Sequence, residues 1–197
     1  MKGLISTLIT LLAFTGTTLA QKSIGVHYSF PARSTVMTFL KVEGRGSYES
    51  KYMYNFGVSY THGLNKVLGV ETGLDYSVHH IILNPAFTGE ETPPPTEKTA
   101  KLFTVPVMLR VNLGNYVYLN GGPLLDFDLS KPRQISDQTG VGVGVGAGGR
   151  YTFKSGLSVF VNPNARLHGL FSFSSGSASY HVVESGVKLG LAYTFAR

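Results

Sequence analysis

The sequence of 197 residues contains no cysteine and no tryptophan, and it is poor in charged residues. Without cysteine the chain has no disulfide framework, no thiolate nucleophile and no Cys-based metal site. Charged residues make up 14% of the chain and hydrophobic residues 43%, which is a low share of charge for a soluble protein. The formal net charge of +6 is spread thinly along the chain, so we expect no nucleic-acid interface. An anionic membrane surface is a more natural partner for scattered basic residues.

Long apolar runs are also missing, apart from one short run at the N-terminus. Lys2 is followed by the apolar run Leu4 to Phe14 and then by the small-x-small site Thr18-Leu19-Ala20. This order predicts a cleaved signal peptide over residues 1–20 and a mature domain over residues 21–197. An uncleaved anchor helix fits less well, because a membrane-spanning helix needs about 20 firmly apolar residues.

What the chain has instead is period-two alternation of apolar and polar residues. It is strictest at the C-terminus, where every second residue is large and apolar: Val187, Leu189, Leu191, Tyr193 and Phe195. No window after Gln21 shows a convincing helical period, so the sequence predicts an all-β domain. The expected strands are Ser23–Phe30, Lys51–Tyr60, Val67–Leu83, Lys101–Leu113, Tyr116–Leu129, Val141–Phe153, Leu157–His168 and Glu184–Arg197.

The connections between these strands alternate between long and short. The four long ones are Pro31–Ser50, Asn84–Ala100, Ser130–Thr139 and Gly169–Val182. An up-and-down barrel with both termini in the periplasm has long loops outside and short turns inside. The pattern therefore predicts an eight-stranded antiparallel up-and-down transmembrane β-barrel. We expect Pro31 to end the first strand and Pro123 to mark a kink or a bulge, because proline cannot donate to a strand ladder.

The apolar face of the strands is the larger one and carries aromatic residues towards both ends. At the short-turn end these are Tyr60, Phe153, Tyr193 and Phe195, and at the long-loop end Phe30, Tyr52, Phe103 and Phe127. Two aromatic girdles are what the interfaces of a bilayer select. A soluble barrel would turn the apolar face inward, but the opposite face is too rich in glycine to coat a soluble protein. We therefore expect the apolar face to contact lipid.

The opposite face carries a few charged residues that would point into the lumen. They are Glu71, Asp75, Arg110, Asp126, Arg150, Arg166 and Lys188. An eight-stranded barrel has room inside for side chains and little else, so enclosed charges must find partners. We predict a salt-bridged plug without a wide pore. The functional alternative is a path for protons or ions.

A glycine-rich stretch matches the dinucleotide-binding pattern. Gly144, Gly146 and Gly149 have the G-x-G-x-x-G spacing. The match lies inside an expected strand, and no helix follows that could present its N-terminus to a phosphate. We therefore expect these glycines to make room for bulky lumen side chains.

Histidines near the long-loop end suggest two further sites. His79 and His80 are adjacent and point to opposite faces of a strand, which spoils them as joint metal ligands, and His168 and His181 lie at other outer strand ends. We expect no metal. Ser77, His79 and Glu184 would supply the residue types of a hydrolase, but nothing in the sequence fixes a base against a nucleophile.

Four stretches carry a resemblance to known proteins. They are Leu102 to Leu109, Tyr118 to Pro123, Gly140 to Tyr151 and Gly190 to Phe195. On these stretches the chain resembles the small outer-membrane β-barrel family related in shape to OmpA and OmpX, and more closely the PorT-like proteins with an outer membrane protein beta-barrel domain. Such proteins usually end in the aromatic residue, whereas here two residues follow it. The resemblance implies insertion by the barrel-assembly machinery, which reads the terminal strand, and for some members a part in secretion or adhesion.

These observations lead to a single functional expectation. We expect a non-enzymatic, integral barrel of a Gram-negative outer membrane, without cofactor, catalytic residue or metal. It would contact outer-membrane lipid and bind protein partners through its long loops, in a structural, adhesion or envelope-scaffolding role. The alternatives are a lipid-modifying enzyme, either an acyl hydrolase or an acyltransferase, and a narrow channel.

Overall fold

The computed structural model describes residues 21–37, 47–85, 94–130, 137–173 and 181–195. The predicted signal peptide lies outside the described residues, and so do parts of all four predicted long loops. Within the described ranges, no helix is long and apolar enough to cross a membrane.

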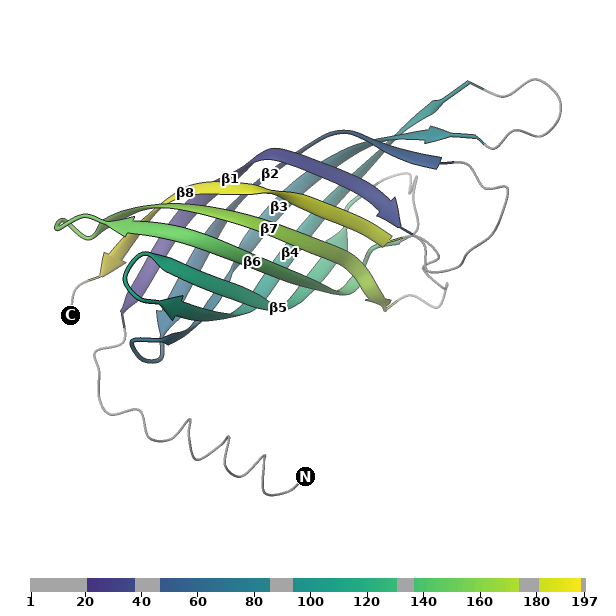
Figure 1. Ribbon diagram of the computed structural model, residues 1–197. Helices are drawn as coiled ribbons and strands as arrows, with labels where there is room; N and C mark the ends of the chain where they lie inside the picture. Colours follow the sequence, from purple (N-terminus) through teal and green to yellow (C-terminus); the bar gives the residue numbers. More distant parts are fainter. Residues whose placement is uncertain (1–20, 38–46, 86–93, 131–136, 174–180, 196–197) are drawn as a thin grey trace.

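The described residues form eight strands that follow one another along the chain (Figure 1). They are β1 (Lys22–Met37), β2 (Ser47–Gly63), β3 (Leu68–Asn84), β4 (Thr96–Leu113), β5 (Val117–Asp128), β6 (Gly140–Thr152), β7 (Leu157–Ser172) and β8 (His181–Phe195). The residues of each strand alternate between the inside and the outside of the sheet, as the period of two in the sequence requires.

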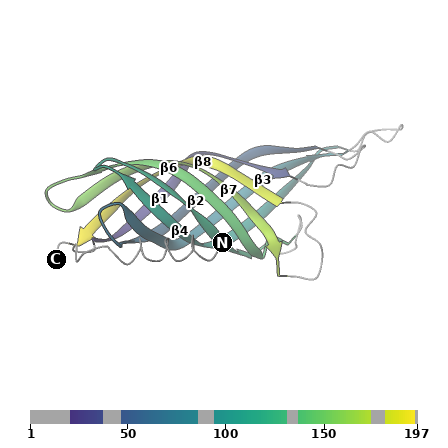
Figure 2. The same cartoon turned by 60° about the horizontal axis from the view of Figure 1, so that its bottom comes forward.

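The sheet closes because β1 pairs with both β2 and β8. Ile24, for example, lies opposite Tyr60 on one side and Tyr193 on the other. Closure pairs the backbone groups that an open sheet would leave unsatisfied at its edges. All neighbours are antiparallel, and the strands run obliquely around the barrel in both views (Figures 1 and 2). The predicted eight-stranded antiparallel up-and-down barrel is confirmed.

Several strands are longer at the long-loop end than the sequence predicts. β1 does not end at Pro31 but continues to Met37, because its pairing with β8 resumes at Ala32 after a register shift that follows Ser29. The irregularity removes the conflict between proline and the strand ladder. Pro123 was expected to mark a kink or bulge, but its pairing with Val143 shows no register shift. Neither Pro31 in β1 nor Pro123 in β5 therefore ends its strand.

β4 shows where the surroundings of the barrel wall change. Its outward side chains are apolar from Phe103 to Leu113, whereas Glu97, Thr99 and Lys101 on the same face are polar. On the inward face Ala100 and Leu102 are buried and apolar, whereas Thr104, Arg110 and Asn112 further along the strand are polar. A wall that is apolar outside in one part and apolar inside in the next passes from lipid into water. The outer ends of β3 and β4 project beyond their neighbours at the upper right of Figure 1.

The predicted girdle residues lie on the outer surface of the barrel. At the short-turn end Tyr60, Phe153, Tyr193 and Phe195 are exposed, and at the long-loop end so are Phe30, Tyr52 and Phe127. Phe103 is half-buried, with its ring centroid 6.3 Å from that of Phe127. Their match to the two bilayer interfaces stays a prediction.

Close approach of two strands explains one of the glycines and gives a test of the barrel wall. A Cβ atom at Gly122 would overlap the backbone carbonyl oxygen of Val107, whereas at Gly121 the nearest atoms are 3.5 Å away. We expect Gly122→Ala to lower the free energy of unfolding by about 1–3 kcal/mol, because the wall must shift to admit the methyl group.

The matched control is Gly121→Ala on the adjacent, outward position, which should leave stability nearly unchanged. Urea titration of the protein folded in lipid vesicles, read from its heat-modifiable gel mobility, measures both variants. Equal stability of the two variants would contradict the packing of β4 against β5.

Candidate functional site

The lumen of the barrel is a chain of polar clusters built from inward side chains. All seven predicted lumen residues lie on this inward face: Glu71, Asp75, Arg110, Asp126, Arg150, Arg166 and Lys188. Their strands bring them together because inward residues of neighbouring strands lie opposite one another in the register, as Asn162 and Lys188 do. The structure adds further titratable side chains to those seven, among them His27, His79, His168 and Glu184.

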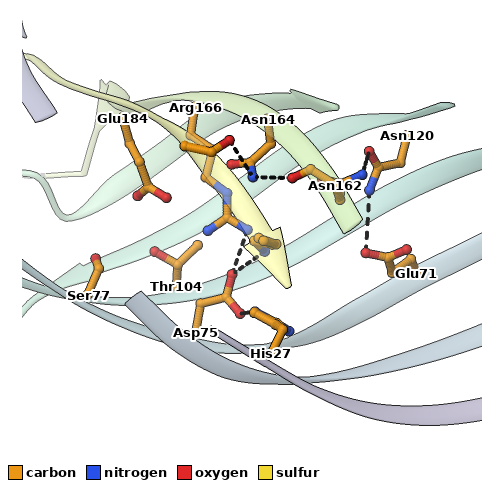
Figure 3. Close-up of polar contacts among 12 residues, drawn as sticks. His27, Glu71, Asp75, Ser77, Thr104, Asn120, Asn162, Asn164, Arg166 and Glu184 are labelled. Atoms are coloured by element: carbon orange, nitrogen blue, oxygen red, sulfur yellow. Dashed lines mark hydrogen bonds and ion pairs between the residues drawn. The ribbon is translucent and has the colours of Figure 1, made fainter. Parts of the chain in front are cut away.

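Asp75 is the centre of the middle cluster (Figure 3). Its carboxylate accepts hydrogen bonds from Arg166 Nη2 at 2.6 Å and Lys188 Nζ at 3.1 Å, and it lies 2.9 Å from His27 Nε2. Four strands supply these groups, so the cluster ties opposite parts of the wall together. Asp75 is only 1% exposed, and a carboxylate buried to this degree requires such partners. We call Asp75, His27, Arg166 and Lys188 the central charge cluster.

Gly57 makes this cluster possible. It lies between His27 and Asp75 in the register of β1, β2 and β3. A Cβ atom at Gly57 would overlap the Asp75 carboxylate and lie 2.9 Å from His27 Nε2. The missing side chain therefore lets two residues that are two strands apart meet across β2. Gly148 has a similar role on β6, where the Tyr118 ring occupies the space of a side chain. These contacts agree with the expectation that inward glycines admit bulky groups.

His168 is the centre of a second cluster nearer the outer mouth. Its Nδ1 atom lies 2.9 Å from Asp126 Oδ1 and its Nε2 atom 3.3 Å from Glu184 Oε2. Asp126 also accepts hydrogen bonds from Thr104 Oγ1 at 2.8 Å and from the Gly169 amide at 3.3 Å. His168 is completely buried, so these two carboxylates hold the imidazole in place from both sides. We call Asp126, His168 and Glu184 the outer histidine cluster.

The suggested hydrolase residues are only partly brought together. Ser77 Oγ and His79 Nε2 form a hydrogen bond of 2.9 Å, but Glu184 bonds to His168 instead, and the His79 and His168 rings meet edge to face at 6.0 Å. Ser77 is 2% exposed and His79 is fully buried, so a lipid substrate has no access to the hydroxyl.

The remaining outer histidines have separate contacts. His80 stacks on the Tyr52 ring at a centroid distance of 4.2 Å, and His181 Nδ1 lies 2.9 Å from the Gly169 carbonyl oxygen. Among the described residues, no group of three or more His, Asp or Glu side chains is arranged to hold a metal ion.

The inner cluster joins Glu71 to Arg110 near the short turns. Arg110 Nη1 donates to Glu71 Oε2 at 3.2 Å, and the guanidinium carbon lies 3.5 Å above the centre of the Tyr118 ring. Asn120 donates to the other Glu71 oxygen at 3.4 Å and is linked in turn to Asn162, as Figure 3 shows. The cluster thus continues the polar network from the middle of the barrel towards its inner end.

Side chains fill the lumen between the inner cluster and the outer mouth. Two cavities there, lined by described residues, measure about 10 Å³ and 20 Å³, which is about the space of one water molecule each. Beyond the outer histidine cluster, apolar side chains lie inside the wall, each at most 2% exposed: Ile81, Ala100, Leu102 and Val182. The fully buried Gln138 accepts a hydrogen bond from the Val182 amide at 3.0 Å. We call these five residues the outer cap.

The fold agrees with comparisons to known proteins. The model of the outer membrane protein beta-barrel domain family matches residues 6–195. Among solved structures, OprG from Pseudomonas aeruginosa has a TM-score of 0.54 at 15% identity, with 90% of this chain and 97% of that one covered. Ail, the attachment invasion locus protein of Yersinia pestis, has a TM-score of 0.50 at 18% identity, with 90% and 100% covered.

A third solved structure is similar to the same degree. The outer membrane protein AlkL has a TM-score of 0.57 at 11% identity, with 93% of each chain covered. A comparison with curated proteins gives no match. At these levels of identity the three structures show a shared fold.

The central charge cluster predicts a large stability difference between two carboxylates. Asp75→Asn removes the carboxylate that forms ion pairs with the buried Arg166 and Lys188, so we expect it to lower the free energy of unfolding by about 3 kcal/mol or more. Glu71→Gln removes the same charge nearer the inner end, where the carboxylate is 19% exposed, and should cost less. Urea titration in lipid vesicles compares the two; a larger effect of Glu71→Gln would contradict the assignment of Asp75 as the centre.

Proposed function

Because this chain belongs to the outer membrane protein beta-barrel domain family, it is an integral barrel of the Gram-negative outer membrane, and we propose that it acts there without catalysis as a surface contact protein. Its partners bind the strand ends and loops that stand outside the bilayer. The lumen serves as a rigid support and does not conduct solutes.

The observation that carries this proposal is the reversal of polarity along β4. Above Phe103 the outward side chains of β4 are polar, while Ala100 and Leu102 on the inward face are buried and apolar, so the wall continues into water with a small apolar core of its own. About seven residues of β4 precede Phe103, which at 3.3 Å per residue is roughly 20 Å of strand beyond the bilayer. Such a length is not needed to cross the membrane, since a spanning strand takes about 9–11 residues. It provides a stiff surface for contact.

The closed lumen supports the same proposal against a channel. A conducting barrel needs a continuous aqueous path, and here the central charge cluster, the outer histidine cluster and the outer cap fill the interior in succession. The burial of Ser77 and His79 supports it against a lipid-modifying enzyme. Ail, whose fold is similar, is named the attachment invasion locus protein, and its structure was solved in complex with the heparin analogue sucrose octasulfate.

Planar bilayers test the closed lumen. The purified protein should produce no stepwise conductance above that of protein-free bilayers, because ions would have to displace paired charges that are buried in a low-dielectric interior. Discrete conductance steps from protein shown to be folded by its gel mobility would contradict a closed barrel and favour the channel.

Site-specific photo-cross-linking in intact cells tests where partners bind. A photoreactive side chain at Lys101, on the outward face beyond the polarity reversal, should give adducts with a partner protein or glycan. The same group at Val107, on the same face of the same strand below the reversal, should give adducts with lipid alone.

A third position, Lys154, reports on the opposite end, because it lies exposed in the turn between β6 and β7. Protein adducts at Lys154 with none at Lys101 would contradict the proposal and place the contacts on the periplasmic side.

A further inference from the structure

A cavity of about 800 Å³ opens at the end of the barrel where the short turns lie. In barrels of this family that end faces the periplasm. The cavity has a lining that includes the basic residues Lys66, Arg110 and Arg150 and the polar residues Asn112, Asn115 and Thr152. We call it the vestibule. It lies at the opposite end from the surface invoked above, and nothing in the proposed surface contact uses it.

The vestibule has a charge of one sign. Arg110, Arg150 and Lys66 are in its lining, and none of the described lining residues is acidic. Arg150 makes no ion pair with any carboxylate in the described part of the chain, in contrast to Arg166 deeper in the lumen. The nearest acid, Glu71, is already bonded to Arg110 and Asn120. Glu71 therefore offsets the charge of Arg110, whereas the charges of Arg150 and Lys66 have no acidic partner in the described part of the chain.

The Arg110 side chain in the lining of the vestibule is held in place by several contacts, and one of its guanidinium nitrogens is not used by them. Its Nε atom donates to Asn112 Oδ1 at 3.2 Å, its Nη1 atom donates to Glu71, and its plane lies on the Tyr118 ring. Arg110 is only 5% exposed, and its buried Nη2 atom has no hydrogen-bond partner among the described residues. A guanidinium group fixed in this way is preorganised to bind an oxyanion, because no side-chain entropy is lost on binding.

The short-turn end of the barrel, where the vestibule lies, also has an excess of basic residues outside the cavity lining. The short turns and the start of β1 at this rim carry Lys22, Lys66 and Lys154, and the short turns contain no Asp or Glu. The sequences of the four predicted long loops, by contrast, contain equal numbers of acidic and basic residues. A concave site lined by one sign of charge concentrates counter-ions at its mouth.

We propose that the vestibule binds a small soluble anion carrying phosphate or carboxylate groups, with Arg110 and Arg150 as its principal ligands. Both arginines point into the lumen, and the barrel wall separates them from the bilayer, so a soluble molecule reaches them more directly than a lipid headgroup does. The volume is much larger than a single phosphate ion, which leaves room for the rest of an organic anion beside the asparagine and threonine side chains of the lining.

Titration calorimetry of the full protein in nanodiscs of zwitterionic lipid tests the proposal, with inorganic phosphate and citrate as separate probes. At least one probe should bind at one site per barrel. Arg150→Gln should weaken that binding at least about tenfold, because a charge-assisted hydrogen bond is lost. Arg150 makes no ion pair within the described chain, so this variant should fold, as checked by its gel mobility.

Two lysines complete the design. Lys66→Gln removes a charge from the lining and should weaken binding by a smaller factor, whereas Lys154→Gln removes one from the same rim outside the lining and should have no effect beyond about twofold. Absence of binding by both probes would overturn the proposal. So would equal weakening by Arg150→Gln and Lys154→Gln, which would indicate a diffuse potential without a site.

Nanodiscs that contain phosphatidylglycerol separate a soluble anion from a lipid headgroup. The affinity for the bound probe should stay within about twofold of its value in zwitterionic nanodiscs. A loss of tenfold or more would show that headgroups occupy the arginines, and it would overturn the assignment to a soluble ligand.

Discussion

Every strand of this barrel must satisfy two different environments with a single period of two. The closed sheet pairs the backbone, so the only freedom left to the sequence is which side chain faces outward. In the membrane-spanning part the outward side chains are apolar, and the polar ones are forced into a lumen too narrow for bulk water. The paired charges of the interior, the glycines that make room for them and the closure of the lumen all follow from this constraint.

The buried charges are arranged so that each finds an opposite one. Asp75 is shared by Arg166 and Lys188, and His168 lies between two carboxylates. Such pairs gain little over apolar packing, but removal of one partner is costly because the other charge stays buried. They therefore fix the register and the relative placement of strands that are distant in the sequence. Only at the inner end, where the lumen opens to water, is a basic residue such as Arg150 left without an acidic partner in the described chain.

The fold was predictable from the sequence because alternation is a local property. The eight periodic segments, the alternation of long and short connections and the inward position of residues such as Arg110 can all be read from spacing alone. Partner choice was not predictable, since it depends on register across strands. The spacing from Lys188 puts Glu184 on the inward face of β8, but only its pairing with Arg166 of β7 shows that it lies next to His168.

The outer strand ends escaped prediction for a different reason. Above the membrane, apolar residues such as Ala100 and Leu102 face the inside of the barrel, so they do not continue the lipid-facing pattern. A prediction that follows the lipid-facing apolar residues therefore stops at the membrane. For β4 it placed the start of the strand at Lys101, whereas the strand begins at Thr96. Proline had the same effect at Pro31, where an irregular pairing with β8 lets the strand continue.

The position of the polarity reversal is the most direct measure of this account. Because the chain has no native cysteine, single spin labels can be placed on the outward face of β4 at Lys101→Cys and Leu109→Cys in the protein folded in bilayers. Electron paramagnetic resonance then compares the access of each label to oxygen, which concentrates in lipid, and to a water-soluble nickel chelate. The account predicts that oxygen is the more effective relaxer at position 109 and the nickel chelate at position 101. Preferential access of the nickel chelate at position 109 would contradict it.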